Sequence, residues 1–217
     1  MPRPPNTDQR RAQIVDGLLK VMSTKGYEGA TTQDIAKAAK LSPGLVHYHF
    51  QAKAEVLEAL MNRLLDEHLA ALDAALTAAG ADPLDRLDAF IDYHLATGAS
   101  ANPRALAVWV SLGAEALKSV DVRTRYVAGL EALLERLVVI LQAGIEAGRF
   151  VDQPPRVAAA AILSTIEGYF VVAATARALI PRRSAAPALK AMARGLLEVA
   201  PEPRRRAPLR ARRGSAS

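Results

Sequence analysis

The segment from Thr31 to Lys53 constrains this chain most, because it contains two short helical stretches separated by only about two residues. Thr31, with Asp34 three positions later, forms an Asp version of the capping box and predicts a helix that begins at Thr32. Ser42 followed by Pro43 predicts the start of the second helix, since the missing N–H of proline costs nothing at the first helical position. So short a connection makes the helices cross sharply, as in a helix-turn-helix.

The second of these helices, Pro43 to about Tyr48, is poor in core-facing residues and suits contact with a surface outside the protein. Gly44 lacks a Cβ, so the helix N-terminus can approach that surface closely, and the unpaired N–H groups there suit a phosphate. Val46 and Phe50 lie four residues apart and are expected to anchor the helix inward. The surface that fits such a helix is the major groove of double-stranded DNA.

Contacts with DNA are therefore expected from both helices. Leu45 and His47 are placed to meet base edges, whereas Tyr48, His49 and Lys53 are placed to reach flanking phosphates, which position a protein without specifying sequence. The full predicted set is Thr31, Thr32, Gln33, Ser42, Pro43, Gly44, Leu45, His47, Tyr48, His49 and Lys53.

The run DIAKAAKLSPGLVHYHFQAKAEVLEAL resembles the DNA-binding signature of the TetR family of bacterial transcriptional regulators. Two positions depart from the family pattern. Lys40 stands where glycine is usual, and a lysine can adopt a left-handed conformation only at a cost of about 1 kcal/mol. His47 replaces the usual tyrosine, so the operator sequence does not carry over from relatives. The matching residues are Thr31, Asp34, Ile35, Ala36, Ala39, Ser42, Gly44, His49, Phe50, Lys53 and Leu57.

The resemblance covers residues from about 10 to 57, and beyond about Leu65 it is one of architecture only. It implies a regulator that binds a palindromic operator as a homodimer, with repression relieved by a small molecule held in the C-terminal body. Neither the effector, the operator, the regulated genes nor the choice between repression and activation follows from the sequence. Choline-type and fatty-acyl sensing follow only from overall similarity, and no named residue supports them.

Hydrophobic periodicity predicts an all-α fold of about nine helices, because no alternating strand pattern occurs. We expect a DNA-binding head of three helices at residues 8–53, a larger effector-binding and dimerisation body at 54–200, and a basic, disordered tail at 201–217. Apart from the two helices described above, we expect helices at 10–25, 54–79, 154–179 and 185–199. Three further helices are expected in the middle of the chain: one begins at Asp82 and Pro83, one begins at Asn102 and Pro103, and one is capped by Asp121 and ends near Gly148.

The charge distribution separates the ends of the chain from its middle. Residues 1–64 carry nine Lys and Arg against six Asp and Glu, residues 65–200 carry thirteen against fifteen, and residues 201–217 carry six against one. Basic ends and a slightly acidic middle fit a head that meets nucleic acid and a body with another task. The arginine-rich tail either adds non-specific phosphate affinity or is a solvated segment without a role.

Several classes of protein are disfavoured. Cysteine is absent, so a disulfide framework, a thiolate metal site and a cysteine nucleophile are excluded. We predict a cytoplasmic protein without a membrane partner, because the N-terminus has no apolar signal region and no apolar run of about eighteen residues is apparent. No catalytic motif or cofactor is evident, which leaves a small helical enzyme as a remote alternative. His47 and His49 point about 200° apart on a helix and cannot share a metal ion.

The stretch VAAAAILSTIEGYFVVAATARALI is apolar almost all round, so a helix there must be covered on more than one side. The natural cover in a chain of this length is a second copy, and we expect the last two helices to form a four-helix dimer interface. Its predicted residues are Ile162, Ile166, Tyr169, Phe170, Ala173, Leu189, Met192 and Leu196.

An effector pocket in the body is a weaker expectation, because aromatic residues at helical spacing are often ordinary core. Glu167 stands out as a carboxylate in an apolar helix, and it either faces a ligand or pairs with Arg123 or Arg125. A ligand-blind regulator whose body serves only to dimerise is the alternative. The predicted lining residues are His68, Phe90, Tyr93, His94, Trp109, Glu115, Glu167 and Phe170.

Overall fold

The structure is a computed structural model that describes residues 6–96 and 103–199. Within those ranges it contains nine α-helices, a short 3-10 helix and no strand, which confirms the all-α prediction. The α-helices are α1 (Asn6–Lys25), α2 (Thr32–Ala39), α3 (Pro43–His49), α4 (Lys53–Ala78), α5 (Pro83–Leu95), α6 (Pro103–Ala116), α7 (Val120–Glu146), α8 (Pro155–Thr175) and α9 (Ala185–Leu196), and the 3-10 helix η2 spans Arg177–Leu179.

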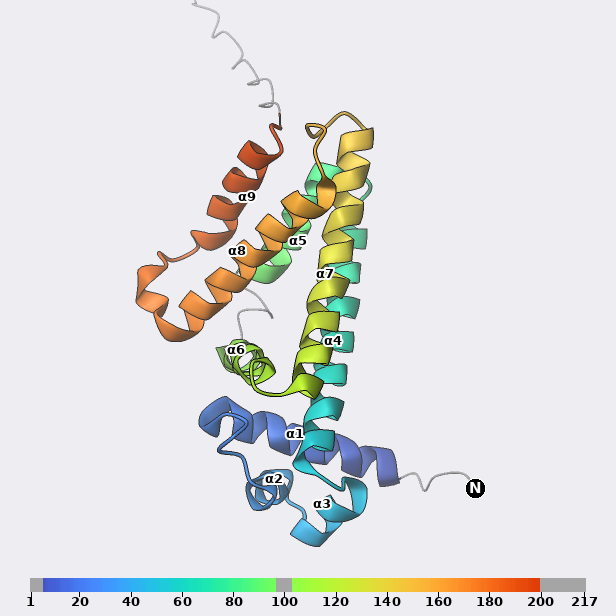
Figure 1. Ribbon diagram of the computed structural model, residues 1–217, viewed down its shortest axis with the longest axis vertical. Helices are drawn as coiled ribbons and strands as arrows, with labels where there is room; N and C mark the ends of the chain where they lie inside the picture. Colours follow the sequence, from blue (N-terminus) through green and yellow to red (C-terminus); the bar gives the residue numbers. More distant parts are fainter. Residues whose placement is uncertain (1–5, 97–102, 200–217) are drawn as a thin grey trace, which may run out of the picture.

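Helices α1, α2 and α3 form a head at one end of an elongated molecule (Figure 1). Gly17 of α1 lies at the crossing with α2, where an added Cβ would stand 2.7 Å from the carbonyl oxygen of Ile35. Glycine therefore allows the two helices to approach closely. Leu18, Ile35 and Phe50 are almost wholly buried between the three helices.

The long helix α4 runs from the head into the body, beside α7 (Figure 1). Its first turns belong to the packing of the head, since Leu57 and Leu60 share one buried cluster with residues of α1. Val108 and Leu112 of α6 join the same cluster, so α6 rests on the head. The hydrophobic core thus continues across residue 54, where the sequence suggests a domain boundary.

Helices α5, α7, α8 and α9 enclose a second buried cluster, which α4 completes with Leu72 and Leu76. The chain turns tightly between α7 and α8, where an added Cβ on Gly144 would stand 2.0 Å from the Phe150 ring. The Val151 N–H donates to the Leu197 carbonyl across 3.0 Å and ties this turn to the end of α9.

Several helix ends differ from the prediction. Helix α1 begins at Asn6 rather than near residue 10, and α4 spans Lys53–Ala78 rather than 54–79. Ser119, not Asp121, caps α7 and accepts from the Val122 N–H across 3.4 Å, which leaves Asp121 in the first turn, where its charge favours the helix dipole. Helix α8 ends at Thr175 rather than 179, and α9 ends at Leu196 rather than 199. The predicted cap Asn102 and the predicted tail 201–217 lie outside the described residues.

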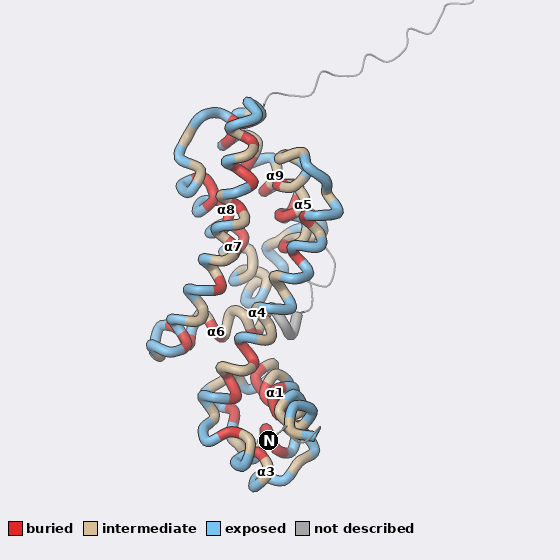
Figure 2. The backbone as a smooth tube through the Cα atoms, turned by 90° about the vertical axis from the view of Figure 1, so that its right-hand side faces the viewer, coloured by how far each residue is buried: buried red, intermediate tan, exposed pale blue. Residues whose placement is uncertain are grey.

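Helix α8 is long and apolar enough, by length and composition alone, to cross a membrane. The expectation that the chain has no such apolar run was therefore wrong. Only 28 % of its apolar window is buried, although Ile162, Leu163 and Ile166 pack in the core of the body. Figure 2 shows buried and exposed positions alternating along α8. A core helix of a globular protein passes the same test, so this finding is weak evidence for a membrane span.

Candidate DNA interface and effector region

The start of α2 is fixed by the capping box that the sequence predicts. The Thr31 hydroxyl accepts the Asp34 N–H across 3.1 Å, and Asp34 Oδ2 accepts the Thr31 N–H across 3.2 Å. Lys25 donates to Asp34 Oδ1 at 2.7 Å, and its hydrogen bond, with those from Thr31, lowers the pKa of the Asp34 carboxyl to about 2. Thr31 and Thr32 therefore stand at the edge of a well-defined helix start, with Gln33 exposed beside them.

The turn between α2 and α3 has the conformation expected from the sequence. Lys40 adopts φ 57° and ψ 41°, in the left-handed region, and its N–H bonds the carbonyl oxygens near the end of α2. The N–H of Leu41 donates to the Ala36 carbonyl across 2.9 Å. This arrangement ends α2 and sets the angle at which α3 leaves it.

Helix α3 presents its N-terminus outward. Ser42 caps it by accepting the Leu45 N–H across 3.3 Å, and Pro43 and Gly44 are exposed. An added Cβ on Gly44 would meet no atom within 4 Å in the described part of the chain. The backbone of this first turn is therefore open to a partner.

The rest of α3 divides into an inner and an outer face. Val46 and Phe50 are 1 % exposed, as expected of its anchors. His47 is exposed and Tyr48 is 77 % exposed, whereas Leu45 is half-buried. The outer face therefore carries an imidazole and a phenol beside the open N-terminus.

Lys53 takes a different role from the predicted phosphate contact. Its ammonium donates to the carbonyl oxygens of Tyr27 and Ala30, both across 3.0 Å, and lies 4.2 Å from the centre of the Tyr27 ring. A lysine held by two carbonyls inside the head is a positioning residue. It fixes the start of α4 against the segment between α1 and α2.

Arg11 is a positioning residue that sequence reasoning missed. Its guanidinium donates to the His49 carbonyl across 2.6 Å and lies 4.0 Å from the centre of the Phe50 ring. It therefore holds the end of α3 against α1, while the half-buried His49 ring packs edge-on to Tyr48 at 5.1 Å between ring centres. A single arginine in an amphipathic helix gives no sequence signal for such a contact.

In the body, Glu167 of α8 meets two aromatic side chains rather than an arginine. Its Oε2 accepts the Trp109 indole N–H across 2.9 Å and the Tyr126 hydroxyl across 3.3 Å. Its Oε1 is buried and has no hydrogen-bond partner among the residues that the structure describes. Pairing with Arg123 or Arg125 is wrong, because Arg123 donates to backbone carbonyls and Arg125 pairs with Glu58.

Burial of this group changes its acid–base chemistry. Desolvation raises the pKa of Glu167, against the lowering effect of the hydrogen bonds from Trp109 and Tyr126. Desolvation and the neighbouring Glu167 likewise raise the pKa of Tyr126 well above its usual range. The site holds a carboxylate in surroundings that disfavour its charge, with one acceptor position unused.

A second group of predicted pocket residues forms a polar contact inside the body. His94 Nδ1 lies 2.7 Å from the Phe90 carbonyl, which only accepts, so Nδ1 carries the proton and His94 Nε2 is the acceptor for His68 Nε2 at 3.2 Å. The Tyr93 hydroxyl donates to the His68 carbonyl across 3.0 Å, and Phe170 packs at the edge of the group. Desolvation lowers the pKa of His94 to about 4. The polar groups of His68, Tyr93 and His94 therefore have hydrogen-bond partners within the core of the body.

Glu115 lies away from both groups, contrary to its predicted place in the pocket. It is 8 % exposed near the end of α6, where its charge helps to raise the pKa of Tyr27 in the head. Helix α6 contacts α1 there, and Lys118 pairs with Glu28 at 3.8 Å. Glu115 therefore belongs to the junction between head and body.

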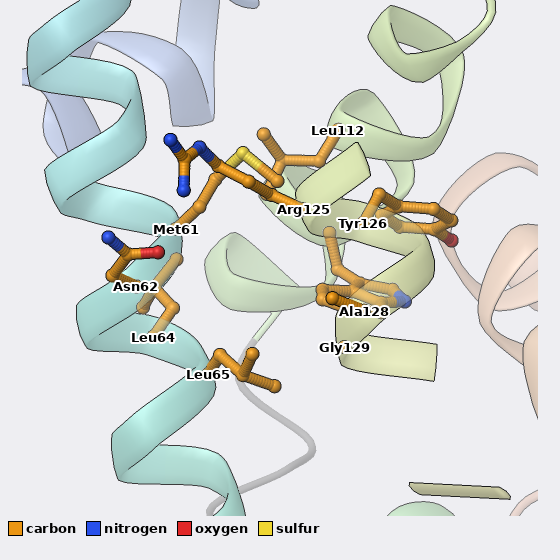
Figure 3. Close-up of a pocket in the computed structure, with 10 residues that line it drawn as sticks. Met61, Asn62, Leu64, Leu65, Leu112, Arg125, Tyr126, Ala128 and Gly129 are labelled. Carbon is orange, nitrogen blue, oxygen red and sulfur yellow. The ribbon is translucent and has the colours of Figure 1, made fainter. Parts of the chain in front are cut away.

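A cavity of about 110 Å³ lies between α4, α6 and α7 (Figure 3). In Figure 3 the Tyr126 hydroxyl points away from the α4 side chains that form the opposite wall, so Glu167 lies beyond the ring. Only Trp109 among the predicted pocket residues lines this cavity. Its lining residues are Met61, Asn62, Leu64, Leu65, Trp109, Leu112, Arg125, Tyr126, Ala128 and Gly129.

Three of the predicted dimer residues face the wrong way. Ile162, Ile166 and Leu189 are at most 2 % exposed and pack in the core of the body, because the all-round apolar sequence did not reveal which face turns inward. Tyr169, Phe170 and Ala173 are half-buried, whereas Met192 and Leu196 are exposed. The outward apolar face consists instead of Val157, Ala160, Ala161, Ser164, Gly168 and Val171 on α8 and Ala188, Ala191, Met192, Gly195 and Leu196 on α9.

Two family models match the chain. Residues 14–60 match the model for bacterial regulatory proteins of the tetR family, and residues 83–198 match the BetI-type transcriptional repressor C-terminal model. Among curated relatives, the HTH-type transcriptional regulator BetI of Rhizobium meliloti (strain 1021) is 31 % identical over 175 residues, which cover 79 % of this chain and 81 % of that protein. BetI of Paraburkholderia phytofirmans is 29 % identical over 123 residues, which cover 57 % and 63 %.

Solved structures share the fold. A transcriptional regulator from Saccharomonospora viridis, solved in complex with choline, superposes with a TM-score of 0.75 at 20 % identity and covers 88 % of this chain and 96 % of that one. A regulator from Pseudomonas aeruginosa PAO1 gives 0.79 at 20 % identity, covering 88 % and 91 %. The two family models and the curated BetI proteins describe transcriptional regulators rather than enzymes. With an N-terminal helix-turn-helix and a matching C-terminal half, this chain belongs to the TetR family of bacterial transcriptional regulators and has a BetI-type C-terminal region.

Proposed function

We propose that this regulator is a cytoplasmic repressor that binds a palindromic operator as a homodimer and leaves it when a small molecule binds in the body. The head at residues 8–53 would read the DNA, and the body at 54–200 would sense the effector and dimerise. The open first turn of α3 carries the DNA half of this proposal, because Gly44 leaves the backbone there accessible and His47 and Tyr48 stand beside it.

The outward apolar face of α8 and α9 supports the homodimer. An almost wholly apolar helix of which 28 % is buried leaves much of its surface to be covered. Gly168 and Gly195 lie on that face, and a Cβ on either would meet nothing within 4 Å in the described residues. Small residues allow two helices to pack closely against their symmetry mates.

For the effector we propose a small organic cation of the quaternary ammonium class. The supporting observation is Glu167, whose second oxygen is buried beside Trp109 and Tyr126 without a partner in the described chain. A carboxylate next to aromatic rings is suited to such a cation. The related regulator from Saccharomonospora viridis was solved with choline, which has this chemistry.

Ligand binding would act by shifting a population of conformations. A cation that favours one spacing of the two heads would move α4, the helix that joins head and body, and DNA affinity would fall by the ratio of its affinities for the two states. In the alternative, a ligand-blind regulator, no compound would change DNA affinity.

The test begins with DNA fragments selected by the protein from a random pool and measured by mobility shift. Gly44→Glu would place a carboxylate in the DNA face and lower affinity by at least about 100-fold, whereas Gly44→Ala would keep most of it. Thermal stability would stay at or above that of the parent, because glutamate suits a helix N-terminus. If Gly44→Glu binds DNA as tightly as the parent, the proposed DNA interface at α3 is refuted. If choline does not weaken DNA binding, the proposed quaternary ammonium effector is refuted.

A further inference from the structure

We propose that the cavity beside Arg125 is a second ligand site, which binds a small carboxylate in competition with Glu58. Its walls are mostly apolar, with Leu64, Leu65 and Leu112 among them. Among the described lining residues, Arg125 is the one that carries a charge, and Asn62 supplies an amide. In Figure 3 both polar side chains reach the α4 side of the cavity. A ligand with an apolar body and one anionic end matches this distribution.

The guanidinium of Arg125 already forms one ion pair, with Glu58. Its Nη2 lies 2.5 Å from Oε1 of Glu58, the single ion pair that joins α7 to the first turns of α4 in the described chain. A guanidinium has five N–H donors, so a pair through one nitrogen leaves donors for a second carboxylate. The two side chains are 36 % and 46 % exposed, and an ion pair in such surroundings is weak enough for a ligand to displace.

The size of the cavity limits the ligand. Its volume of about 110 Å³ is below the roughly 150 Å³ of an apolar cavity that admits benzene. Benzene has six non-hydrogen atoms, so butyrate, which also has six, fits only with its apolar chain in the cavity and its carboxylate outside it, at the partly exposed Arg125. The cavity is smaller than the roughly 300 Å³ at which drug-sized ligand sites begin.

Occupation of this site would act on the head through α4. Glu58 stands next to Leu57, which is buried in the packing of the head. Release of Glu58 would remove the ion pair between α7 and the first turns of α4, while Arg63 of α4 would stay paired with Asp16 of α1 at 2.9 Å. Further along α4, Asp73 would stay paired with Arg136 of α7 at 2.6 Å. The first turns of α4 would then move with the head, while the later turns stay packed in the body. Butyrate binding itself is independent of the effector proposal at Glu167, but any effect on DNA affinity rests on the proposed function.

The experiment is a calorimetric titration of the full-length protein with butyrate, with the neutral isostere butyramide and with choline. Butyrate is expected to bind at least about tenfold more tightly than butyramide, whereas choline reports on the separate site at Glu167. Arg125→Gln would abolish this preference. Glu58→Gln would free the guanidinium and strengthen butyrate binding about three- to tenfold. Arg149→Gln, which breaks a comparable surface pair with Asp82, would leave binding unchanged.

Arg125→Gln is expected to weaken butyrate binding, whereas Glu58→Gln is expected to strengthen it. If the ion pair had only a structural role, either variant would break it, and both would change butyrate binding in the same direction. Equal binding of butyrate and butyramide would overturn the proposal, as would weaker butyrate binding by Glu58→Gln or parent-like binding by Arg125→Gln. The effector proposal fails separately: choline that does not bind the parent, or that binds Glu167→Gln equally well, would refute it and leave the butyrate result unchanged.

Discussion

Trp109 donates its indole N–H to Oε2 of Glu167 across 2.9 Å, while the other oxygen of that carboxylate is buried without a partner in the described residues. The two side chains come from α6 and α8, far apart in the sequence. Half of the carboxylate is thus satisfied and half is not, which costs stability in the absence of a ligand.

Glu167→Gln is expected to stabilise the ligand-free protein at pH 7 by about 1 kcal/mol, because it removes a desolvated charge and keeps an oxygen for Trp109. Because burial raises the pKa of Glu167, the penalty is present only where the carboxyl ionises. The gain should therefore shrink as the pH falls through the raised pKa of the folded state, and it should vanish below the ordinary value of 4.5. Denaturant unfolding at several pH values measures it, with the exposed Glu146→Gln as control. A variant less stable than the parent at pH 7 would contradict this reading.

Lys40→Gly should raise the free energy of unfolding by roughly 0.5 to 1 kcal/mol, since glycine adopts the left-handed conformation at φ 57° without steric cost. The matched control is Lys37→Gly, an exposed position inside α2 where glycine should cost about 1 kcal/mol instead. Thermal unfolding of both variants tests the pair. Two variants with losses of similar size would show that the backbone of the turn is not strained.

The His68–His94 contact should make the protein sensitive to acid. Desolvation lowers the pKa of His94 from 6.5 to about 4, so the fold favours the neutral ring, and this stability is complete above pH 6.5. This stability is lost as the pH falls from 6.5 towards 4, because the unfolded chain binds the proton more tightly there; the total loss is about 3 kcal/mol.

The measurement is the free energy of unfolding as a function of pH for the parent and for His94→Gln, which should have a flatter profile between pH 4 and 6.5. His47→Gln, at an exposed position, should keep the profile of the parent. Equal slopes for the parent and His94→Gln would show that the pair does not titrate as described.

Gly168→Arg should convert the dimer into a monomer without loss of fold. The added side chain meets open space within the protomer but would lie between two copies on the outward face of α8. Sedimentation at micromolar concentration measures the effect, and Ala74→Arg on the exposed side of α4 is the control. Should the parent itself sediment as a monomer, the proposed dimer would be refuted.

Local signals in the sequence determined the helix-turn-helix and the helical class. Thr31 with Asp34, and Ser42 with Pro43, satisfy backbone groups within three residues, so the helix starts were readable without knowledge of the fold. The left-handed conformation at Lys40 was expected from the family resemblance, because glycine is usual at that position.

Only the tertiary structure decided which side chains meet across helices. Helix α8 is apolar almost all round, so its periodicity did not show which face turns inward, and Ile162 and Ile166 were assigned to the wrong face. Lys53, Arg11 and Glu167 found their partners through the crossing of helices that lie tens of residues apart in the chain. Local sequence sets the hydrogen bonds of a helix and its ends, whereas the partners of a long polar side chain depend on how the helices pack.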